Sequence, residues 1–278
     1  MLQAGVIGLG QIGGGVALCL ARAGRLAAVY DVYPEVAEKL EGVPACVSSP
    51  AELAGSCDVV IIAVVSAEQV RDALGGPDGL LSGAREDLTI VLMSTVSLPD
   101  LHSLSEMAGA AGVKLVDCGV TGGPAAARKG LVCLVGADDA DYQRVLPVLE
   151  DCSKSVVLMG GPAAGMAAKV ARNVLVYGTY HAAYEAAKLA NSAGVDVATL
   201  AAAIDASAAS MGNPMAFQLP LDPVQTGGRD EKLLRQATSE LMRKDLAAAT
   251  ELARALDIEL QTPAMALGDY KGIFGLED

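Results

Sequence analysis

Three glycines near the start of the chain restrict its fold more than any other feature. Residues 3–7 form a short apolar segment that predicts a strand, and residues 11–23 predict a helix. Gly8, Gly10 and Gly13 occupy the turn between them in the spacing G-x-G-x-x-G. At such a turn the first glycine permits the tight bend, the second lets a ligand approach the backbone, and the third lets helix and strand pack closely. The pattern predicts a strand–turn–helix unit that binds a dinucleotide.

The turn and the next strand also predict the cofactor. Backbone N–H groups at the start of the helix can bind a pyrophosphate, and the residues expected to contact it are Gly8, Leu9, Gly10, Gln11, Ile12 and Gly13. Asp31 ends the second expected strand, where a carboxylate can accept hydrogen bonds from both ribose hydroxyl groups. The same carboxylate would repel a 2′-phosphate, so we predict NAD as the cofactor in preference to NADP.

Strand-like and helix-like segments alternate through the first part of the chain. Strands are also expected at 27–31, 43–47, 58–65, 88–92, 113–117, 131–135 and 155–159, and helices at 34–41, from Ser49-Pro50 onward, and near 99–110 and 138–150. The run at 58–65 is continuously apolar, as expected for a strand covered on both faces. The alternation predicts an α/β fold with a doubly wound, Rossmann-like and mostly parallel sheet.

The character of the chain changes after Gly161-Pro162. Residues 166–193 contain no proline and a single glycine, which predicts one helix of roughly 40 Å at about 1.5 Å per residue. The remainder reads as helical, with breaks expected at 194, 212–214, 220–228 and 263. We therefore predict an NAD-binding domain at 1–161 and an all-helical substrate and oligomerisation domain at 162–278, joined by the long interdomain helix.

Composition argues against several classes of function. The formal charge of −13 disfavours a surface that binds nucleic acid or an anionic membrane. No apolar run approaches the ~18 residues that a membrane helix needs, and the N-terminus carries no basic leader. The six cysteines are scattered, so we expect reduced thiols in a cytoplasmic protein. Two histidines without a Cys/His cluster predict no metal site.

A lysine in the long helix is the candidate catalytic residue. Lys169 and Asn173 lie four residues apart, so they project from the same face of an Ala- and Val-rich segment. Desolvation on an apolar face can lower the pKa of an amine, as an acid/base catalyst near neutral pH requires. The alternative is a solvated surface lysine.

A glycine-rich loop is the candidate substrate site. Asp117-Cys-Gly-Val-Thr-Gly-Gly-Pro124 follows an expected strand. Thr121 offers a hydroxyl group, and Gly122 and Gly123 offer unobstructed backbone N–H groups, a combination that suits a carboxylate. The alternative is an ordinary Gly-Gly-Pro turn.

Together these motifs resemble the β-hydroxyacid dehydrogenase family, which includes 3-hydroxyisobutyrate dehydrogenases and tartronate semialdehyde reductases. The resemblance runs nearly end to end, and the segments that carry it are Gly8-Leu-Gly-Gln-Ile-Gly13, Ser94-Thr95, 117–123, 165–173 and Lys244-Asp245-Leu246. It implies hydride transfer between NAD and a small-molecule carboxylate substrate, a β-hydroxy acid or its semialdehyde. It also implies a homodimer or homotetramer.

The resemblance implies individual roles as well. Lys169 would be the catalytic acid/base, while Asn173, Thr121, Gly122 and Gly123 would hold the substrate carboxylate. Further cofactor contacts are implied for Val64, Val65, Thr95 and Lys244, which spacing alone does not predict.

The chain departs from the family pattern at several positions. Val64-Val65 replaces Leu-Pro and Thr121 replaces Ser, which leaves the chemistry intact. Gly119 lies where the family has a nearby proline, and Arg172 replaces the first member of an asparagine pair, so the pocket rim is reshaped. We expect Arg172 to face solvent; a grip on a second anionic group of the substrate is the alternative.

Two other functions remain open. An imine reductase or reductive aminase would share the architecture, but Lys169 argues against it because such an enzyme needs a differently placed proton donor. A non-catalytic NAD-binding module is the second alternative, and the complete set of motifs argues against that.

Overall fold

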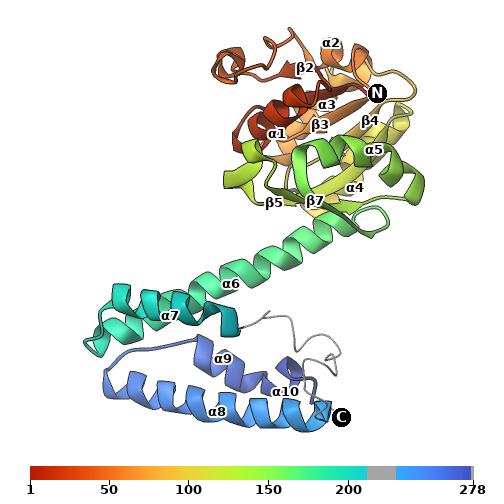
Figure 1. Cartoon of the computed structure of the whole chain (residues 1–278). Helices are drawn as coiled ribbons and strands as arrows, with labels where there is room; N and C mark the ends of the chain where they lie inside the picture. The colour runs from red at the N-terminus through yellow and green to blue at the C-terminus, as the bar shows by residue number, and fades with distance from the viewer. Residues whose placement is uncertain (212–229, 277–278) are drawn as a thin grey trace. The chain divides into compact units, whose positions relative to one another are not determined.

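One seven-stranded sheet organises the first part of the chain (Figure 1). In the computed structural model, which describes residues 1–211 and 230–276, the strand order is β2-β1-β3-β4-β5-β6-β7. The strands are β1 Ala4–Ile7, β2 Leu26–Tyr30, β3 Val59–Ile62, β4 Thr89–Leu92, β5 Lys114–Thr121, β6 Leu131–Gly136 and β7 Ser153–Gly160. Neighbouring strands are parallel except β5 and β6, which are antiparallel. The predicted mostly parallel, doubly wound sheet is confirmed.

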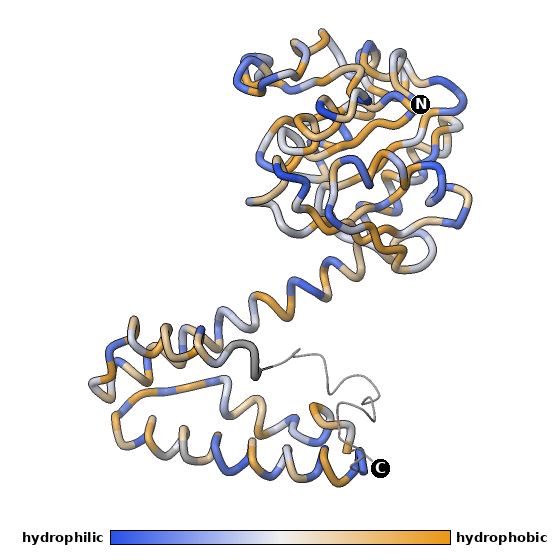
Figure 2. The backbone as a smooth tube through the Cα atoms, in the orientation of Figure 1, coloured by the Kyte–Doolittle hydropathy of each residue, from blue (hydrophilic) through white to orange (hydrophobic). Residues whose placement is uncertain are grey.

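Both faces of the sheet are covered because its strands are apolar on both sides. Along β3, Val59 and Ile61 pack in one buried cluster, and Val60 and Ile62 pack in another on the opposite face. The helices that supply the rest of these clusters are α1 Gln11–Arg22 and α5 Asp139–Cys152 for the first, and α2 Pro50–Gly55, α3 Ala67–Leu74 and α4 Leu98–Ala110 for the second. Figure 2 shows the strands mostly in the colour of hydrophobic residues.

Three short 3₁₀ helices complete this part of the chain: η1 Pro34–Lys39, η2 Leu80–Ser82 and η3 Gly123–Arg128. The segment expected as a helix at 34–41 is therefore the 3₁₀ helix η1. Helix α3 had no counterpart among the expected elements, because its eight residues are too few for the helical spacing of Val70, Ala73 and Leu74 to repeat. Ser66 begins it, accepting a hydrogen bond from the Gln69 N–H group (3.2 Å).

The strand expected at 43–47 is wrong. These residues adopt no regular structure, and the backbone hydrogen bond that connects them to the sheet runs from the Val47 N–H group to the Val29 oxygen (2.9 Å). Pro44 lacks an N–H group, and Gly42 has a left-handed φ of 79°. Both features oppose a regular ladder beside β2.

The second part of the chain is helical. Its elements are α6 Ala164–Ser192, α7 Val197–Met211, α8 Glu231–Ala255, α9 Thr262–Gly268 and α10 Tyr270–Ile273. The long helix predicted after residue 165 is confirmed as α6, and Gly194 and Pro263 lie at helix ends as expected. The breaks expected at 212–214 and 220–228 lie outside the described residues. Glu185 of α6 accepts hydrogen bonds from the N–H groups of Gln261 and Thr262 at the start of α9.

The chain divides into two compact units, Met1–Asn173 and Val174–Asp278. The division falls within α6, because the first turns of this helix pack against the sheet. Within the part of the chain that the structure describes, no helix is long and apolar enough to cross a membrane. All six cysteines are free thiols.

Candidate active site

The glycine turn has the geometry that its spacing predicts. Gly8 has a φ of 87°, and a Cβ atom on Gly13 would lie 1.9 Å from the Gly8 oxygen, so only glycine lets α1 pack this closely on β1. In contrast, a Cβ atom on Gly10 would meet no described atom within 4 Å. The turn is therefore crowded on the inside and open at Gly10, where a ligand can approach the backbone.

The start of α1 offers an anion site. Among the described residues, no side chain caps this helix, and its first turn carries no acidic residue. At the end of β2, the Asp31 carboxylate accepts hydrogen bonds from the N–H groups of Leu9 (2.6 Å) and Tyr33 (2.9 Å). These bonds fix the acid beside the glycine turn. This site fits a dinucleotide. The open backbone at Gly10 and the uncapped start of α1 suit its pyrophosphate, and the Asp31 carboxylate suits its ribose hydroxyl groups.

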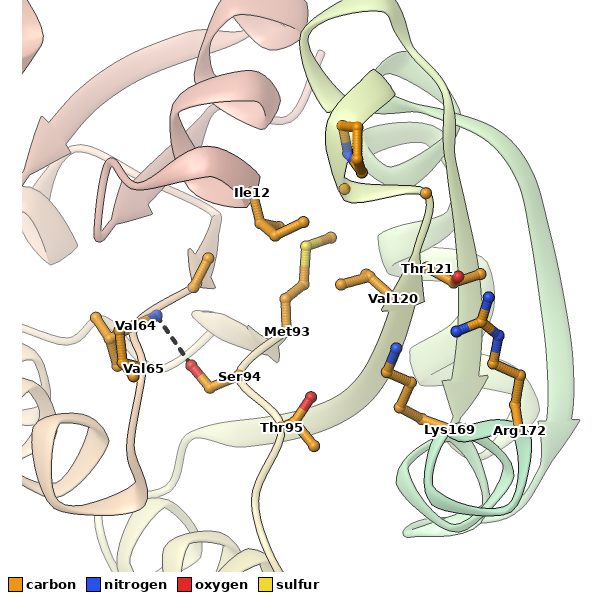
Figure 3. A pocket seen from close by; sticks show the side chains of 14 residues that line it. Ile12, Val64, Val65, Met93, Ser94, Thr95, Val120, Thr121, Lys169 and Arg172 are labelled. Atoms are coloured by element: carbon orange, nitrogen blue, oxygen red, sulfur yellow. Dashed lines mark hydrogen bonds between the residues drawn. The ribbon is translucent and has the colours of Figure 1, made fainter. Parts of the chain in front are cut away.

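A cavity of about 540 Å³ lies in the first compact unit, where several strands end (Figure 3). Its walls come from the segments that follow β3 and β4, from the end of β5 and from the first turns of α6. It is lined by Ile12, Ala63, Val64, Val65, Met93, Ser94, Thr95, Val120, Thr121, Gly122, Gly123, Pro124, Lys169 and Arg172. Ligands of open α/β sheets bind outside the carboxyl ends of the strands, and this cavity has that position.

A buried aspartate anchors the start of α6. Asp117 of β5 is only 2% exposed, and its carboxylate accepts hydrogen bonds from the N–H groups of Ala163 (2.7 Å) and Met166 (2.6 Å). Burial raises the pKa of the Asp117 carboxyl, and the backbone N–H donors at the start of α6 oppose that rise. The carboxylate thus ties the first turn of the helix that carries Lys169 to the sheet.

A glycine in β5 lets Lys169 approach the sheet. A Cβ atom on Gly119 would lie 2.4 Å from the Lys169 Cβ atom and 2.9 Å from the Gly165 oxygen. Any side chain at this position would displace α6. Gly119, where the chain departs from the family pattern, therefore allows β5 and α6 to pack closely.

The Lys169 ammonium group is half-buried. Within residues 1–173, no hydrogen bond and no carboxylate partner involves it. Partial burial, and then the positive charge of Arg172, lower the pKa of Lys169 below the ordinary lysine value. An amine that loses its proton more readily than free lysine suits acid/base catalysis.

The glycine-rich loop is fixed against the cofactor turn through helix α1. The Cys19 thiol donates to the Ala126 oxygen (3.4 Å), and the Arg22 guanidinium donates to the Ala127 oxygen (2.7 Å). A Cβ atom on Gly123 would lie 3.1 Å from the Ile12 side chain. These contacts hold the predicted carboxylate site and the predicted pyrophosphate site in one rigid arrangement.

Another residue of the cavity had no predicted role. Ser94 follows β4, is 3% exposed, and its hydroxyl oxygen accepts a hydrogen bond from the Val64 N–H group (2.9 Å). The bond, drawn in Figure 3, joins the segments that carry Val64, Val65 and Thr95. The sequence signals for Ser94 are its place two residues after a buried strand and its membership of the Ser94-Thr95 segment that carries the family resemblance.

The structure brings together part of the predicted site. The predicted residues that line the cavity are Ile12, Val64, Val65, Thr95, Thr121, Gly122, Gly123 and Lys169. The other residues of the glycine turn lie outside its lining, as do Asp31 and Asn173. Lys244 belongs to α8 in the second compact unit, where its ammonium lies 3.3 Å from the Asp245 carboxylate.

Arg172 fits neither of the two expectations alone. Its side chain is exposed to solvent, yet its guanidinium also lines the cavity. Figure 3 shows Lys169 and Arg172 both projecting from α6 toward Val120 and Thr121. Residues three apart lie on one side of a helix, and the arginine is long enough to reach the cavity while it stays in contact with water.

A dinucleotide turn beside a cavity with a desolvated lysine defines a nicotinamide-dependent oxidoreductase. The chain belongs to the β-hydroxyacid dehydrogenase family. Residues 3–161 match the NAD binding domain of 6-phosphogluconate dehydrogenase, and residues 163–271 match the NAD-binding domain of NADP-dependent 3-hydroxyisobutyrate dehydrogenase.

Curated relatives match along nearly the whole chain. The 3-hydroxyisobutyrate dehydrogenase of Pseudomonas aeruginosa is 30% identical over 99% of this chain and 92% of its own length. The 2-hydroxy-3-oxopropionate reductase of Escherichia coli K12 is 29% identical over 95% of this chain and 88% of its own length.

Solved structures agree on the fold. A crystal structure of an oxidoreductase from Mycobacterium avium 104 matches with a TM-score of 0.89 at 30% identity, covering 100% of both chains. An imine reductase from a Pseudomonas species matches with a TM-score of 0.75 at 18% identity, covering 97% of this chain and 92% of its own. The second likeness shows a shared fold and does not bear on activity.

Proposed function

We propose that the protein oxidises a small β-hydroxy acid with NAD, or reduces the corresponding semialdehyde with NADH. The observation that carries the proposal is the placement of Lys169, with a lowered pKa and no carboxylate partner within residues 1–173, in one cavity with Thr121, Gly122 and Gly123. Relatives named as a 3-hydroxyisobutyrate dehydrogenase and a 2-hydroxy-3-oxopropionate reductase support this substrate class.

The residues of the chain supply binding and proton transfer. When bound, the nicotinamide provides the hydride acceptor for oxidation and the hydride donor for reduction. Neutral Lys169 accepts the hydroxyl proton, and protonated Lys169 returns it in the reverse direction and polarises the carbonyl. Thr121, Gly122 and Gly123 hold the substrate carboxylate, so the position of the carbinol carbon is set by binding. Asn173 orients Lys169 or the substrate. No step requires a metal ion.

The remaining assigned residues serve the cofactor. The pyrophosphate of the cofactor lies at the start of α1, beside Leu9, Gly10, Gln11 and Ile12. Gly8 and Gly13 give the turn its tight geometry. Val64, Val65 and Thr95 complete the nicotinamide side of the cavity, and Lys244 contributes from α8. We propose that these functions divide between an NAD-binding domain at 1–161 and a helical domain at 162–278, a division supported by the meeting point of the two family matches.

A panel of small hydroxy acids tests the proposal, with NADH formation followed at 340 nm. We expect turnover with at least one β-hydroxy acid. Reduction of cyclic imines, or reductive coupling of a ketone with an amine, without any oxidation of hydroxy acids would instead favour the imine reductase alternative. Absence of turnover with every substrate, together with measurable NAD binding, would favour the binding module.

We expect NAD to be preferred over NADP by at least ~10-fold in kcat/KM. With NADP, the Asp31 carboxylate would lose a hydrogen bond to the ribose and repel the 2′-phosphate, and together these effects cost more than about 1.4 kcal/mol. The Asp31 carboxylate stands fixed beside the turn, and 32–34 contain no basic residue that could pair with a 2′-phosphate. Asp31→Asn removes the charge and should narrow the ratio. Equal kcat/KM for the two cofactors in the wild-type protein would contradict this assignment.

We also propose a homodimer or homotetramer. Tyr177, Tyr180 and Tyr184 of α6 are 63%, 65% and 67% exposed, a large aromatic surface of the kind that subunits cover. A monomeric mass by light scattering at micromolar concentration would contradict this.

We further propose a cytoplasmic location, supported by the six free thiols and testable by cell fractionation.

A further inference from the structure

The cavity has an unbalanced charge. Its lining contains two cationic side chains, Lys169 and Arg172, and no aspartate or glutamate. The protein as a whole carries a formal charge of −13, so the cationic lining contrasts with the acidity of the whole chain. The imbalance marks the cavity as a site for anionic groups.

Arg172 has no carboxylate partner within residues 1–173. The hydrogen bond that its guanidinium makes there is a long one, 3.4 Å, to the Oδ1 atom of the neighbouring Asn173. Two other arginines of this unit do pair with carboxylates: Arg25 with Asp151 at 2.6 Å, and Arg85 with Asp58 at 2.5 Å. Arg172 therefore keeps its planar donors available for a ligand.

The proposed function assigns the substrate carboxylate to Thr121, Gly122 and Gly123 and gives the Arg172 guanidinium no partner. The proposed carboxylate site consists of the Thr121 hydroxyl and the N–H groups of Gly122 and Gly123, which are neutral donors at the end of β5. Arg172 belongs to a different element, α6, and projects into the same cavity toward Thr121 (Figure 3). Two groups of anion-binding donors that come from different elements and meet in one cavity can hold two anionic groups of one small molecule.

We propose that Arg172 forms a second anion subsite, so that the favoured substrate is a β-hydroxy acid with a further carboxylate, phosphate or sulfonate group. The inference rests on the proposed function and names its substrate class. A guanidinium binds such groups through two parallel hydrogen bonds, which a single asparagine at this position cannot reproduce.

The experiment compares one monoanionic and three dianionic hydroxy acids, with carboxylate, phosphate or sulfonate as the second group. Wild type, Arg172→Asn, Arg172→Lys and the control Arg71→Asn are measured in parallel. Arg71 lies in α3, outside the cavity, in an exposed ion pair with Asp100. On the alkaline plateau of the pH profile, where Lys169 is neutral in both enzymes, Arg172→Asn should lower kcat/KM for the preferred dianion by about 10–100-fold and leave kcat/KM for the monoanion within about 3-fold. Arg172→Lys should retain part of the kcat/KM that Arg172→Asn loses, and Arg71→Asn should leave kcat/KM unchanged for both kinds of substrate.

Other outcomes overturn the subsite. An equal loss of kcat/KM for both kinds of substrate would mean that Arg172 binds the carboxylate they share. No loss of kcat/KM for either kind would mean that Arg172 contacts solvent and not the substrate. Calorimetric binding of the same compounds to the protein with NADH gives a readout independent of turnover, where Arg172→Asn should weaken the dianion by a similar factor. If binding responds and no compound is oxidised, the proposed reaction fails and the subsite stands. If hydroxy acids are oxidised but Arg172→Asn leaves the dianion-to-monoanion ratio of kcat/KM unchanged, the proposed reaction stands and the subsite fails.

Discussion

Replacement of Lys169 by alanine is expected to lower kcat for hydroxy-acid oxidation by about 10²–10⁴-fold, the usual contribution of a general acid/base. The side chain is half-buried in the cavity, and no other lysine lines it. Binding of NAD should change little, since Asp31 and all residues of the glycine turn except Ile12 lie outside the lining of this cavity. Steady-state rates at saturating substrate, with NAD affinity from fluorescence titration, separate the two effects.

The control for this substitution is Lys154→Ala, which removes an exposed lysine of β7 in the same compact unit. We expect wild-type turnover from it. Retention of more than a tenth of wild-type kcat in Lys169→Ala would mean that another group transfers the proton.

The pH dependence has a definite sign. Oxidation needs neutral Lys169, so its rate should fall as the pH drops through the pKa of this group, which partial burial and the Arg172 charge hold below the ordinary lysine value. Removing that charge in Arg172→Asn should raise the pKa and move the acidic limb of the kcat profile to higher pH. In Lys169→Ala the limb should disappear.

Local sequence patterns predict most of this fold because each strand is either continuously apolar or bounded by glycine and proline. The failure at 43–47 has a local cause as well: apolar composition suggested pairing, while Pro44 removed a donor that pairing needs. Helix α3 was not predicted because it has only eight residues, so the helical spacing of Val70 and Leu74 occurs once; burial of these two side chains stabilises it.

The candidate site is harder to predict because it depends on contacts between distant segments. Helical spacing places Lys169, Arg172 and Asn173 near one another, yet it does not distinguish which neighbour of the lysine faces the cavity. The structure has Arg172 along the wall and Asn173 outside the lining. Similarly, no local pattern reveals that Gly119 makes room for Lys169, fifty residues later in the chain.

Asp117 is the clearest example of such a long-range role, and removing it should have the largest effect on stability. Asp117→Ala leaves the N–H groups of Ala163 and Met166 without their acceptor in a buried place. Each unsatisfied buried donor costs about 1–3 kcal/mol, so we expect the free energy of unfolding to fall by about 2–5 kcal/mol. Denaturant unfolding followed by circular dichroism measures it.

Asp117→Asn and Asp100→Ala sharpen this test. The amide keeps one acceptor but turns an NH₂ donor toward the other N–H group, so Asn should recover only part of the stability. Asp100 lies in the first turn of α4, where it is partly exposed and pairs with Arg71, so its loss should cost at most about 1 kcal/mol. Equal losses for Asp117→Ala and Asp100→Ala would show that the buried carboxylate does not anchor α6. A fall in kcat of folded Asp117→Asn, measured where the variant is fully native, would show that the anchor also holds Lys169 in position.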